Sequence, residues 1–441
     1  YMKAFNIKKI STFLLMLFTA GMAYVVTSCN DDPHKYESTS GKPTIHYLRM
    51  PDIDLSDQVI EGAYMANTIC IVGDNLRSTR KILFNDQEAI LNTSFITEHT
   101  LLVNVPRELP VNVTDKMYLI SKSDTVEYPF TVLIPAPELS SMACEYVKPG
   151  DIATINGDFL LNYDDDPMVI TMPDGKEVTK FESLSRTSVS FVVPDDCEES
   201  GAIVVATAHG ISASTKFHFN DNRGIMFEFD GLTGLTNHGW HDREILSDET
   251  SISGNFVQLG DGTAVMDANG GWDDNNFAFE YWCGDWNDPQ EFKGTDIRLT
   301  DLVDFSNWEE MALKFELYIP TSSPWSAGAM QLIFAGTDLV TLGGGGGYPA
   351  ANNDFFKGDK LPRGLYRPWE NTGSFDTNDE WITVTVPFSS FVYGFEGQAA
   401  TGSLSASSFA SFTMFVVEGG IAGEDCTPIF KVDNIRAVPY N

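Results

Sequence analysis

Basic residues are scarce in this chain of 441 residues. Lysine and arginine together number 28, against 62 aspartates and glutamates, which gives a formal net charge of -34 at pH 7. A surface with this charge repels phosphate backbones, anionic lipid headgroups and acidic polysaccharides. We therefore expect no nucleic-acid partner, and any polysaccharide that the protein binds should be neutral.

Cysteine is also rare, with six in the chain. If Cys29 is modified as argued below, five remain, and an odd number cannot all pair within one chain. Cys144 with Cys197, and Cys283 with Cys426, could each bridge within a domain, but buried free thiols are the more common use of cysteine. No two cysteines have metal-ligand spacing, so we expect no cofactor. The acidic stretches "NYDDDP" and "DANGGWDDNN" could hold a structural calcium ion, although neither has EF-hand spacing and solvated loops are the default.

Signatures of catalysis are missing as well. The chain has neither a GxSxG elbow nor an HExxH motif, which removes the usual support for acyl transfer and zinc hydrolysis. Glycoside hydrolysis needs two carboxyl groups at a defined separation, and no pair is identifiable among the many acids. We expect a protein that is not an enzyme. A glycoside hydrolase with an unrecognised carboxylate pair, and a surface adhesin that binds another protein, are the alternatives.

The longest apolar run lies at the N-terminus. Lys3, Lys8 and Lys9 precede "STFLLMLFTAGMAYVV", and "VTSC" then ends at Cys29. This order is typical of an export signal, and the cysteine after small residues resembles a bacterial lipoprotein signal. We expect residues 1–29 to be the signal, lipidation at Cys29 and an acidic tether over residues 30–42. A plain secretory signal and a membrane-spanning anchor remain the alternatives.

A repeat follows the tether. "ANTICIVGDNL" (66–76) matches "GDIATINGDFL" (150–160), and "TLLVNVPRELP" (100–110) matches "SVSFVVPDDCE" (188–198). Each copy consists of short alternating segments separated by Gly, Asn, Asp and Pro turns, which predicts a small antiparallel β-sandwich. The copies resemble immunoglobulin-like IPT/TIG domains, which usually act as spacers. We expect such domains at residues 43–135 and 136–220.

The remaining residues, 221–441, form a domain of different composition. Alternating segments such as "MALKFELYIP" and "SFTMFVVEGG" predict a larger β-sandwich of jelly-roll type, separated by long loops rich in Gly, Asn and Asp. Loops on a rigid sandwich are the usual place for binding residues. The predicted fold class is therefore all-β, with tandem immunoglobulin-like sandwiches followed by a jelly-roll-type β-sandwich.

All eight tryptophans lie in this last domain. Trp308 and Trp381 adjoin alternating strands, which predicts that they cap the core, whereas Trp282 and Trp286 in "EYWCGDW" are ambiguous. Four tryptophans lie among polar residues in predicted loops: Trp240, Trp272, Trp325 and Trp369. An exposed indole can stack on the C–H face of a pyranose while polar neighbours bind its hydroxyls. We expect these four to bind a glycan together with Asp273, Asn275 and His241; the alternative is that they fold inward and seal the sandwich.

The order of these features resembles a known family, the non-catalytic surface glycan-binding lipoproteins of Bacteroidota polysaccharide-utilisation systems, of the type whose C-terminal domain binds xyloglucan. The resemblance depends on the lipoprotein start, the tandem spacers and the segments "FEFDGLTG", "GGWDDN" and "FKVDNIRAVPY". It implies capture of a neutral β-linked plant polysaccharide of xyloglucan, β-glucan or β-mannan type. It also implies a lipid anchor in the outer membrane, facing the cell exterior, and a glycan importer complex as partner. Trp240 and Trp272 match the family's aromatic platform, whereas Gly271 stands where an aromatic residue is expected.

Overall fold

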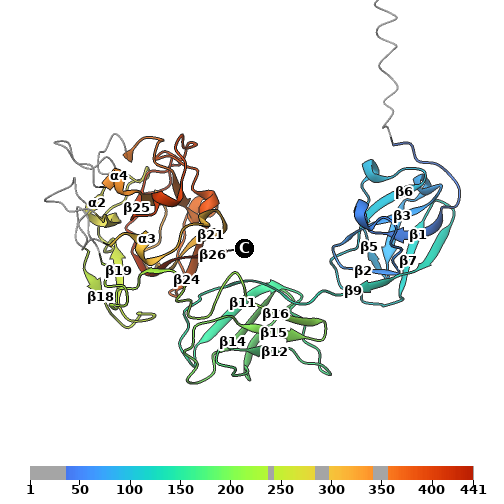
Figure 1. Cartoon of the computed structure of the whole chain (residues 1–441), viewed down its shortest axis with the longest axis horizontal. Helices are drawn as coiled ribbons and strands as arrows, with labels where there is room; N and C mark the ends of the chain where they lie inside the picture. The colour runs from blue at the N-terminus through green and yellow to red at the C-terminus, as the bar shows by residue number, and fades with distance from the viewer. Residues whose placement is uncertain (1–35, 237–242, 284–296, 341–355, 441) are drawn as a thin grey trace, which may run out of the picture. The chain divides into compact units, whose positions relative to one another are not determined.

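The computed structural model describes residues 36–236, 243–283, 297–340 and 356–440, and these are almost entirely β. The chain divides into two compact units, Tyr1–Pro135 and Ala136–Asn441. Figure 1 shows one β-sandwich in the first unit and two in the second. The expected fold class, tandem immunoglobulin-like sandwiches followed by a larger β-sandwich, is confirmed. In the described part of the chain, helices are too short or too polar to cross a membrane.

The first immunoglobulin-like domain encloses a core of aliphatic and aromatic residues between two sheets. The sheets have the strand orders β1-β3-β6 and β5-β4-β7-β8, and β2 pairs with β9 in parallel. Alternate residues of the strands face the core, as Ile82 and Phe84 do on β4. The strands are β1 (Thr44–Arg49), β2 (Gly62–Tyr64), β3 (Thr68–Asp74), β4 (Lys81–Phe84), β5 (Gln87–Glu88), β6 (Thr100–Asn104), β7 (Lys116–Ile120), β8 (Thr125–Pro129) and β9 (Thr131–Leu133).

The second immunoglobulin-like domain repeats this plan. Its sheets have the orders β10-β11-β14-β13 and β12-β15-β16, around a core that includes Ile155, Phe191 and Phe219. The strands are β10 (Glu138–Met142), β11 (Ile152–Asp158), β12 (Val169–Thr171), β13 (Phe181–Leu184), β14 (Ser188–Val192), β15 (Val204–Thr207) and β16 (Gly210–Ala213).

Two glycines explain why the repeat is visible in the sequence. Gly73 on β3 lies against β1, and Gly157 on β11 lies against β10, so closely that a Cβ atom would overlap the carbonyl oxygen of Thr44 or Glu138. The residue after each Gly-Asp pair, Asn75 or Phe159, has a positive φ of 55°. Both copies therefore need the same glycine and the same left-handed turn.

The C-terminal domain is a sandwich of two larger sheets. One has the order β18-β19-β26-β21-β24, with β17 also paired to β26, and the other has the order β20-β25-β22-β23. Its strands are β17 (Ile225–Phe227), β18 (Ile245–Leu246), β19 (Phe256–Leu259), β20 (Ala278–Tyr281), β21 (Met311–Tyr318), β22 (Ala329–Ala335), β23 (Arg363–Tyr366), β24 (Ile382–Pro387), β25 (Ser411–Val417) and β26 (Phe430–Pro439). The helices are short: α2 (Asp274–Phe277), α3 (Leu299–Leu302) and α4 (Thr337–Val340).

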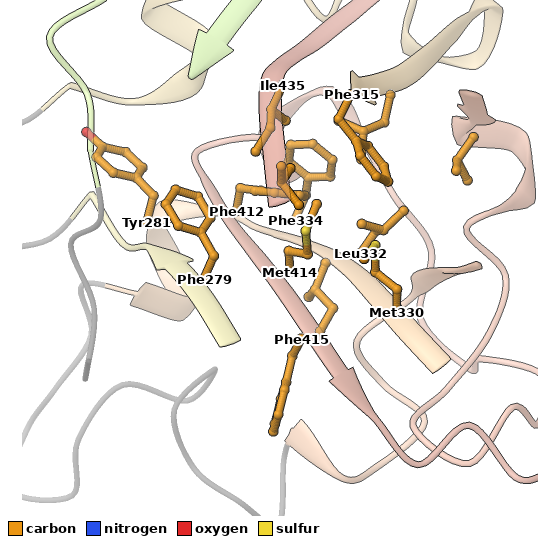
Figure 2. Packing of buried hydrophobic residues seen from close by; sticks show 14 of the residues in the cluster. Phe279, Tyr281, Phe315, Met330, Leu332, Phe334, Phe412, Met414, Phe415 and Ile435 are labelled. Carbon is orange, nitrogen blue, oxygen red and sulfur yellow. The ribbon is translucent and has the colours of Figure 1, made fainter. Parts of the chain in front are cut away.

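Aromatic side chains fill the space between these sheets. Figure 2 shows Phe334 and Phe412, from neighbouring strands β22 and β25, beside Phe315 and Ile435 from the opposite sheet. The rings of Phe334 and Phe412 lie 5.0 Å apart. Packing of this kind makes the sandwich a rigid support for the loops at its edge. Cys283 is among the buried residues, and neither Cys144 nor Cys197 nor Cys426 forms a disulfide.

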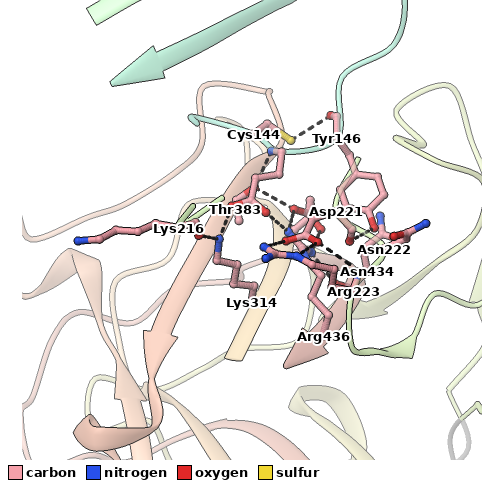
Figure 3. A network of polar contacts seen from close by, with 12 residues as sticks. Cys144, Tyr146, Lys216, Asp221, Asn222, Arg223, Lys314, Thr383, Asn434 and Arg436 are labelled. Carbon is pink, nitrogen blue, oxygen red and sulfur yellow. Dashed lines mark hydrogen bonds and ion pairs between the residues drawn. The ribbon is translucent and has the colours of Figure 1, made fainter. Parts of the chain in front are cut away.

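Buried charges join the second immunoglobulin-like domain to the C-terminal domain (Figure 3). Glu145, which follows β10, accepts hydrogen bonds from Lys314 Nζ on β21 (2.5 Å) and from Arg436 Nη2 on β26 (2.7 Å). Arg436 Nη1 also donates to Glu316 at 2.7 Å. Burial raises the pKa of Glu316 to about 7, although the Arg436 guanidinium lowers it.

Backbone contacts reinforce this junction. Thr383 on β24 donates its N–H to the carbonyl oxygen of Ala143 (2.9 Å), and its hydroxyl accepts the N–H of Glu145 (2.7 Å). Removing one partner of a buried ion pair leaves an uncompensated charge, which costs about 3–5 kcal/mol. Residues 136–441 are therefore the smallest module that we expect to fold intact, and not the C-terminal domain by itself.

Candidate functional site

Trp272 lies on a loop whose backbone is tied to the C-terminal part of the same sandwich. Ala268 accepts the N–H of Gly423 at 2.7 Å, and Gly270 accepts the N–H of Glu418 at 2.7 Å. Gly270 has a φ of 70°, and a Cβ atom there would overlap the backbone of Gly328. Only glycine fits this close approach without strain. The backbone that carries Trp272 is thus held in one conformation.

The indole of Trp272 is half-buried at the edge of the aromatic core. Its ring is nearly perpendicular to those of Phe415 (centroids 4.9 Å apart) and Phe356 (5.4 Å). The ammonium nitrogen of Lys357 lies 4.7 Å from the ring centroid, which is cation–π geometry. Trp272 is therefore neither a freely exposed platform nor a fully buried seal. The core orients the ring, while part of its surface stays accessible.

Three carboxylates lie on chain segments next to this tryptophan: Asp267 is on the same loop, Glu396 follows Phe395, whose ring lies 6.1 Å from the indole, and Glu418 donates its backbone N–H to Gly270. Burial raises the pKa of Glu418, and the nearby charges of Glu396 and Asp267 raise it further, while Lys357 lowers it. Asp267 also orders the loop, because its Oδ1 accepts the N–H groups of Asn269 (2.8 Å) and Gly271 (3.3 Å). Carboxylates held in this way are hydrogen-bond acceptors for hydroxyl groups.

The Asp267 carboxylate also lies against Gly271. Asp267 Oδ2 lies so close that it would overlap a Cβ atom at this position. The aromatic neighbour expected before Trp272 is absent, and the Asp267 carboxylate lies beside Gly271.

Asp273 and Asn275 occupy the short helix after Trp272. Asp273 caps α2, and its carboxylate accepts hydrogen bonds from the backbone N–H (3.2 Å) and the side-chain amide (2.8 Å) of Asn276. Asn275 is exposed, and its carbonyl accepts a hydrogen bond from Arg243 Nη1 at 2.6 Å. Arg243 also donates to the carbonyls of Asp274 and Ala278. Asp273 thus has a clear structural role, and Asn275 lies on the surface near Trp272.

Two of the predicted glycan-binding tryptophans belong to the core, and their prediction was wrong. Trp325 is 0% exposed, lies 5.1 Å from the ring of Phe430, and donates its indole N–H to the carbonyl of Ala327. Trp369 is 3% exposed and donates its indole N–H to the carbonyl of Gly328 at 2.8 Å. Polar residues close by in the chain, such as Ser322 and Glu370, are exposed, while both indoles turn inward. Neither ring has a face that a sugar could reach.

A family model assigns the C-terminal domain. Residues 219–439 match the surface glycan-binding protein B xyloglucan-binding domain. The chain belongs to this family. It is also similar to the crystal structure of surface glycan-binding protein B from Prevotella bryantii, with 42% identity over 91% of this chain and 100% of that chain, and a TM-score of 0.71.

The chain is also similar to an IPT/TIG domain-containing protein of Bacteroides ovatus, with 28% identity over 229 residues. These residues are 48% of this chain and 45% of that protein, so the match spans less than half of the relative's length. The IPT/TIG name agrees with the two immunoglobulin-like domains seen here. The family resemblance expected from the sequence is confirmed.

Several expectations fall outside the described residues. Trp240 and His241 belong to residues 237–242, Trp286 belongs to 284–296, and Cys29 precedes residue 36.

The remaining tryptophans lie within the described residues. Trp282 is buried, and its indole N–H donates to Thr413 Oγ1 at 3.1 Å. Trp308 is half-buried against the core, as predicted for a capping residue. For calcium, the described residues contain no group of three acidic, histidine or cysteine side chains that could hold a metal ion.

The sequence analysis missed the residues that surround Trp272. Phe356, Lys357, Glu396, Phe415 and Glu418 are distant from it in the chain, and only the fold brings them together. The one local signal is the apolar segment of β25, which ends at Val417, directly before Glu418.

Proposed function

We propose that this member of the family binds a neutral β-linked polysaccharide of xyloglucan, β-glucan or β-mannan type at the surface around Trp272, and that it does so without cleaving the polymer. The observation that carries the proposal is the half-buried indole of Trp272 within the segment that matches a xyloglucan-binding domain. The exposed part of the indole provides the apolar face on which the C–H groups of a pyranose stack.

The polar residues around the indole supply the rest of the recognition. Asp267, Glu396 and Glu418 provide acceptors for sugar hydroxyls, and Lys357 provides a donor. Three acids and one base make the surface negative, so an anionic polysaccharide would be repelled. A neutral polysaccharide can stack on the indole and form hydrogen bonds with these charged side chains without being repelled.

We also propose that Cys29 carries lipid, that the protein faces the exterior from the outer membrane, and that it delivers glycan to an importer complex of the same system. The lipoprotein-like start of the chain supports the anchor. A non-catalytic receptor of this kind would concentrate polymer near the import machinery. Globomycin inhibits lipoprotein signal cleavage, so its effect on processing of the full chain tests the anchor.

Affinity electrophoresis of residues 30–441 in gels that contain one polysaccharide each tests the binding function. We expect retardation by xyloglucan, mixed-linkage β-glucan or glucomannan, and no retardation by polygalacturonate, which is anionic. Mobility that is unchanged in every neutral gel would contradict the proposal.

The three carboxylates beside Trp272 make an assay for catalysis necessary, because glycoside hydrolases use paired carboxyl groups. We expect no reducing ends above background when the protein is incubated with the polysaccharide that it binds best. Release of reducing ends that Glu418→Gln abolishes would favour the hydrolase alternative instead.

A further inference from the structure

A cleft lies in the second unit, between the second immunoglobulin-like domain and the C-terminal domain. Its volume is about 760 Å³, and residues of both domains line it. Tyr146, Asp151 and Ile152 belong to one wall, and Glu249, Glu380 and Trp381 belong to the other. Pockets for small organic ligands span about 300–1,000 Å³, so this cleft has the size of a binding site.

Trp381 is held in a fixed orientation on its wall. Its indole N–H donates to the carbonyl of Thr250 at 2.6 Å, and its ring lies 5.6 Å from Tyr318 and 6.0 Å from Phe256. The side chain is half-buried, so it does not cap the core as completely as the sequence suggested. With its N–H already bonded, the ring offers the cleft an apolar surface and no unsatisfied donor.

The walls keep their spacing because the junction beside the cleft is rigid. Glu145 follows directly after Cys144, which lines the cleft, and its carboxylate is bonded to both Lys314 and Arg436. Across the cleft, Lys148 Nζ donates to the carbonyl of Ser251 at 2.8 Å. A cleft made by two domains can hold a ligand with defined geometry only when the domains do not separate.

We infer that this cleft is a second glycan subsite, in which Trp381 stacks on a neutral pyranose and residues of the second immunoglobulin-like domain contact its other side. This inference rests on the proposed function, because it assigns the same class of ligand to a second place. The exposed carboxylates Asp151, Glu249 and Glu380 outnumber Lys148 on the walls, which disfavours an anionic ligand. Carboxylates and an oriented indole together suit the hydroxyl and C–H groups of a neutral sugar.

The role of the immunoglobulin-like domain changes accordingly. Ile152, at the start of β11, is 58% exposed and lines the cleft. In the C-terminal domain alone, the cleft would have one wall. The second domain is thus part of a binding surface and not only a spacer.

Calorimetric titration of residues 30–441 with cellohexaose and with a xyloglucan oligosaccharide tests the subsite. We expect two binding events in the parent protein. Ile152→Arg places a long side chain in the cleft without removing a buried contact, and it should reduce the stoichiometry to one. The matched control is Ile211→Arg, because Ile211 is 71% exposed on β16 of the same domain and does not line the cleft. This control should keep both events.

The Trp272→Ala background weakens the site at Trp272, so that the cleft accounts for more of the remaining binding. There we expect residual binding, which Ile152→Arg weakens by at least about 10-fold and Ile211→Arg leaves unchanged. A single event in the parent protein, or residual binding that is insensitive to Ile152→Arg, would overturn the subsite while leaving the proposed function in place. Absence of any binding by the parent protein would overturn both.

Discussion

Replacing Arg436 by methionine should destabilise residues 136–441 by about 3–5 kcal/mol, because it leaves Glu145 and Glu316 buried without their guanidinium partner. Arg436 is 0% exposed, so water cannot replace the lost hydrogen bonds. In a thermal scan of residues 30–441, the transition of the second unit should fall by about 5–8 °C for a unit of this size. The transition of the first unit should not move, because it folds separately.

Two further variants separate charge from packing at this junction. Lys180→Met breaks an exposed ion pair with Glu182 in the same unit, so it should change stability by no more than about 1 kcal/mol. Adding Glu316→Gln to Arg436→Met removes the carboxylate that has lost its guanidinium partner, while Glu145 keeps its bond to Lys314, and this should restore part of the loss. An Arg436→Met protein that melts with the parent would mean that the two domains are not joined through these ions.

Trp325→Ala should cost about 3–5 kcal/mol of stability, because it opens a cavity beside Phe430 in a closely packed core. Glycan binding at temperatures where the variant is folded should stay close to that of the parent, since no face of Trp325 is accessible. Thermal scans and glycan titrations of the same sample measure both quantities. A Trp325→Ala protein with parental stability and weakened binding would restore the original prediction that this residue belongs to the glycan site.

The alternation of short apolar segments predicted the two immunoglobulin-like sandwiches, where burial has a period of two, as on β4. The long strands of the C-terminal sandwich, such as β21 and β25, are buried along their whole length and do not show this period. The repeat was equally visible, since Gly73 and Gly157 are required by a close approach that allows no side chain. The strand pattern depends on residues that are near one another in the sequence, and the repeat depends on a motif that occurs twice.

Tryptophan exposure could not be predicted in the same way. Trp325 and Trp369 have polar neighbours, as Trp272 has, yet they are buried, because exposure depends on which distant strands the loop covers. Their indole N–H groups are bonded to the carbonyls of Ala327 and Gly328, which removes the penalty for burying a polar atom. Local composition indicates that a loop is solvated, but it does not indicate the direction of one side chain.

The junction was also beyond prediction from sequence patterns. Glu145, Glu316 and Arg436 are charged residues next to or within strands, and charge alone predicts exposure. Their burial follows from the packing of a second domain against the outer face of β21 and β26. A contact of this kind between two domains leaves no periodic pattern of apolar residues in the sequence of either domain.

The most direct test of the central claim is a calorimetric titration of Trp272→Ala beside the parent protein with a xyloglucan oligosaccharide. The matched control is Trp308→Ala, which removes another half-buried tryptophan packed against the same core, at Phe409, and not part of the Trp272 surface. We predict that Trp272→Ala weakens binding by about 1–3 kcal/mol, or about 5- to 150-fold, as expected for loss of an apolar contact. Trp308→Ala should lower the melting temperature and leave the affinity unchanged. Equal affinities for the parent and a folded Trp272→Ala protein would contradict the assignment of this surface as the glycan site.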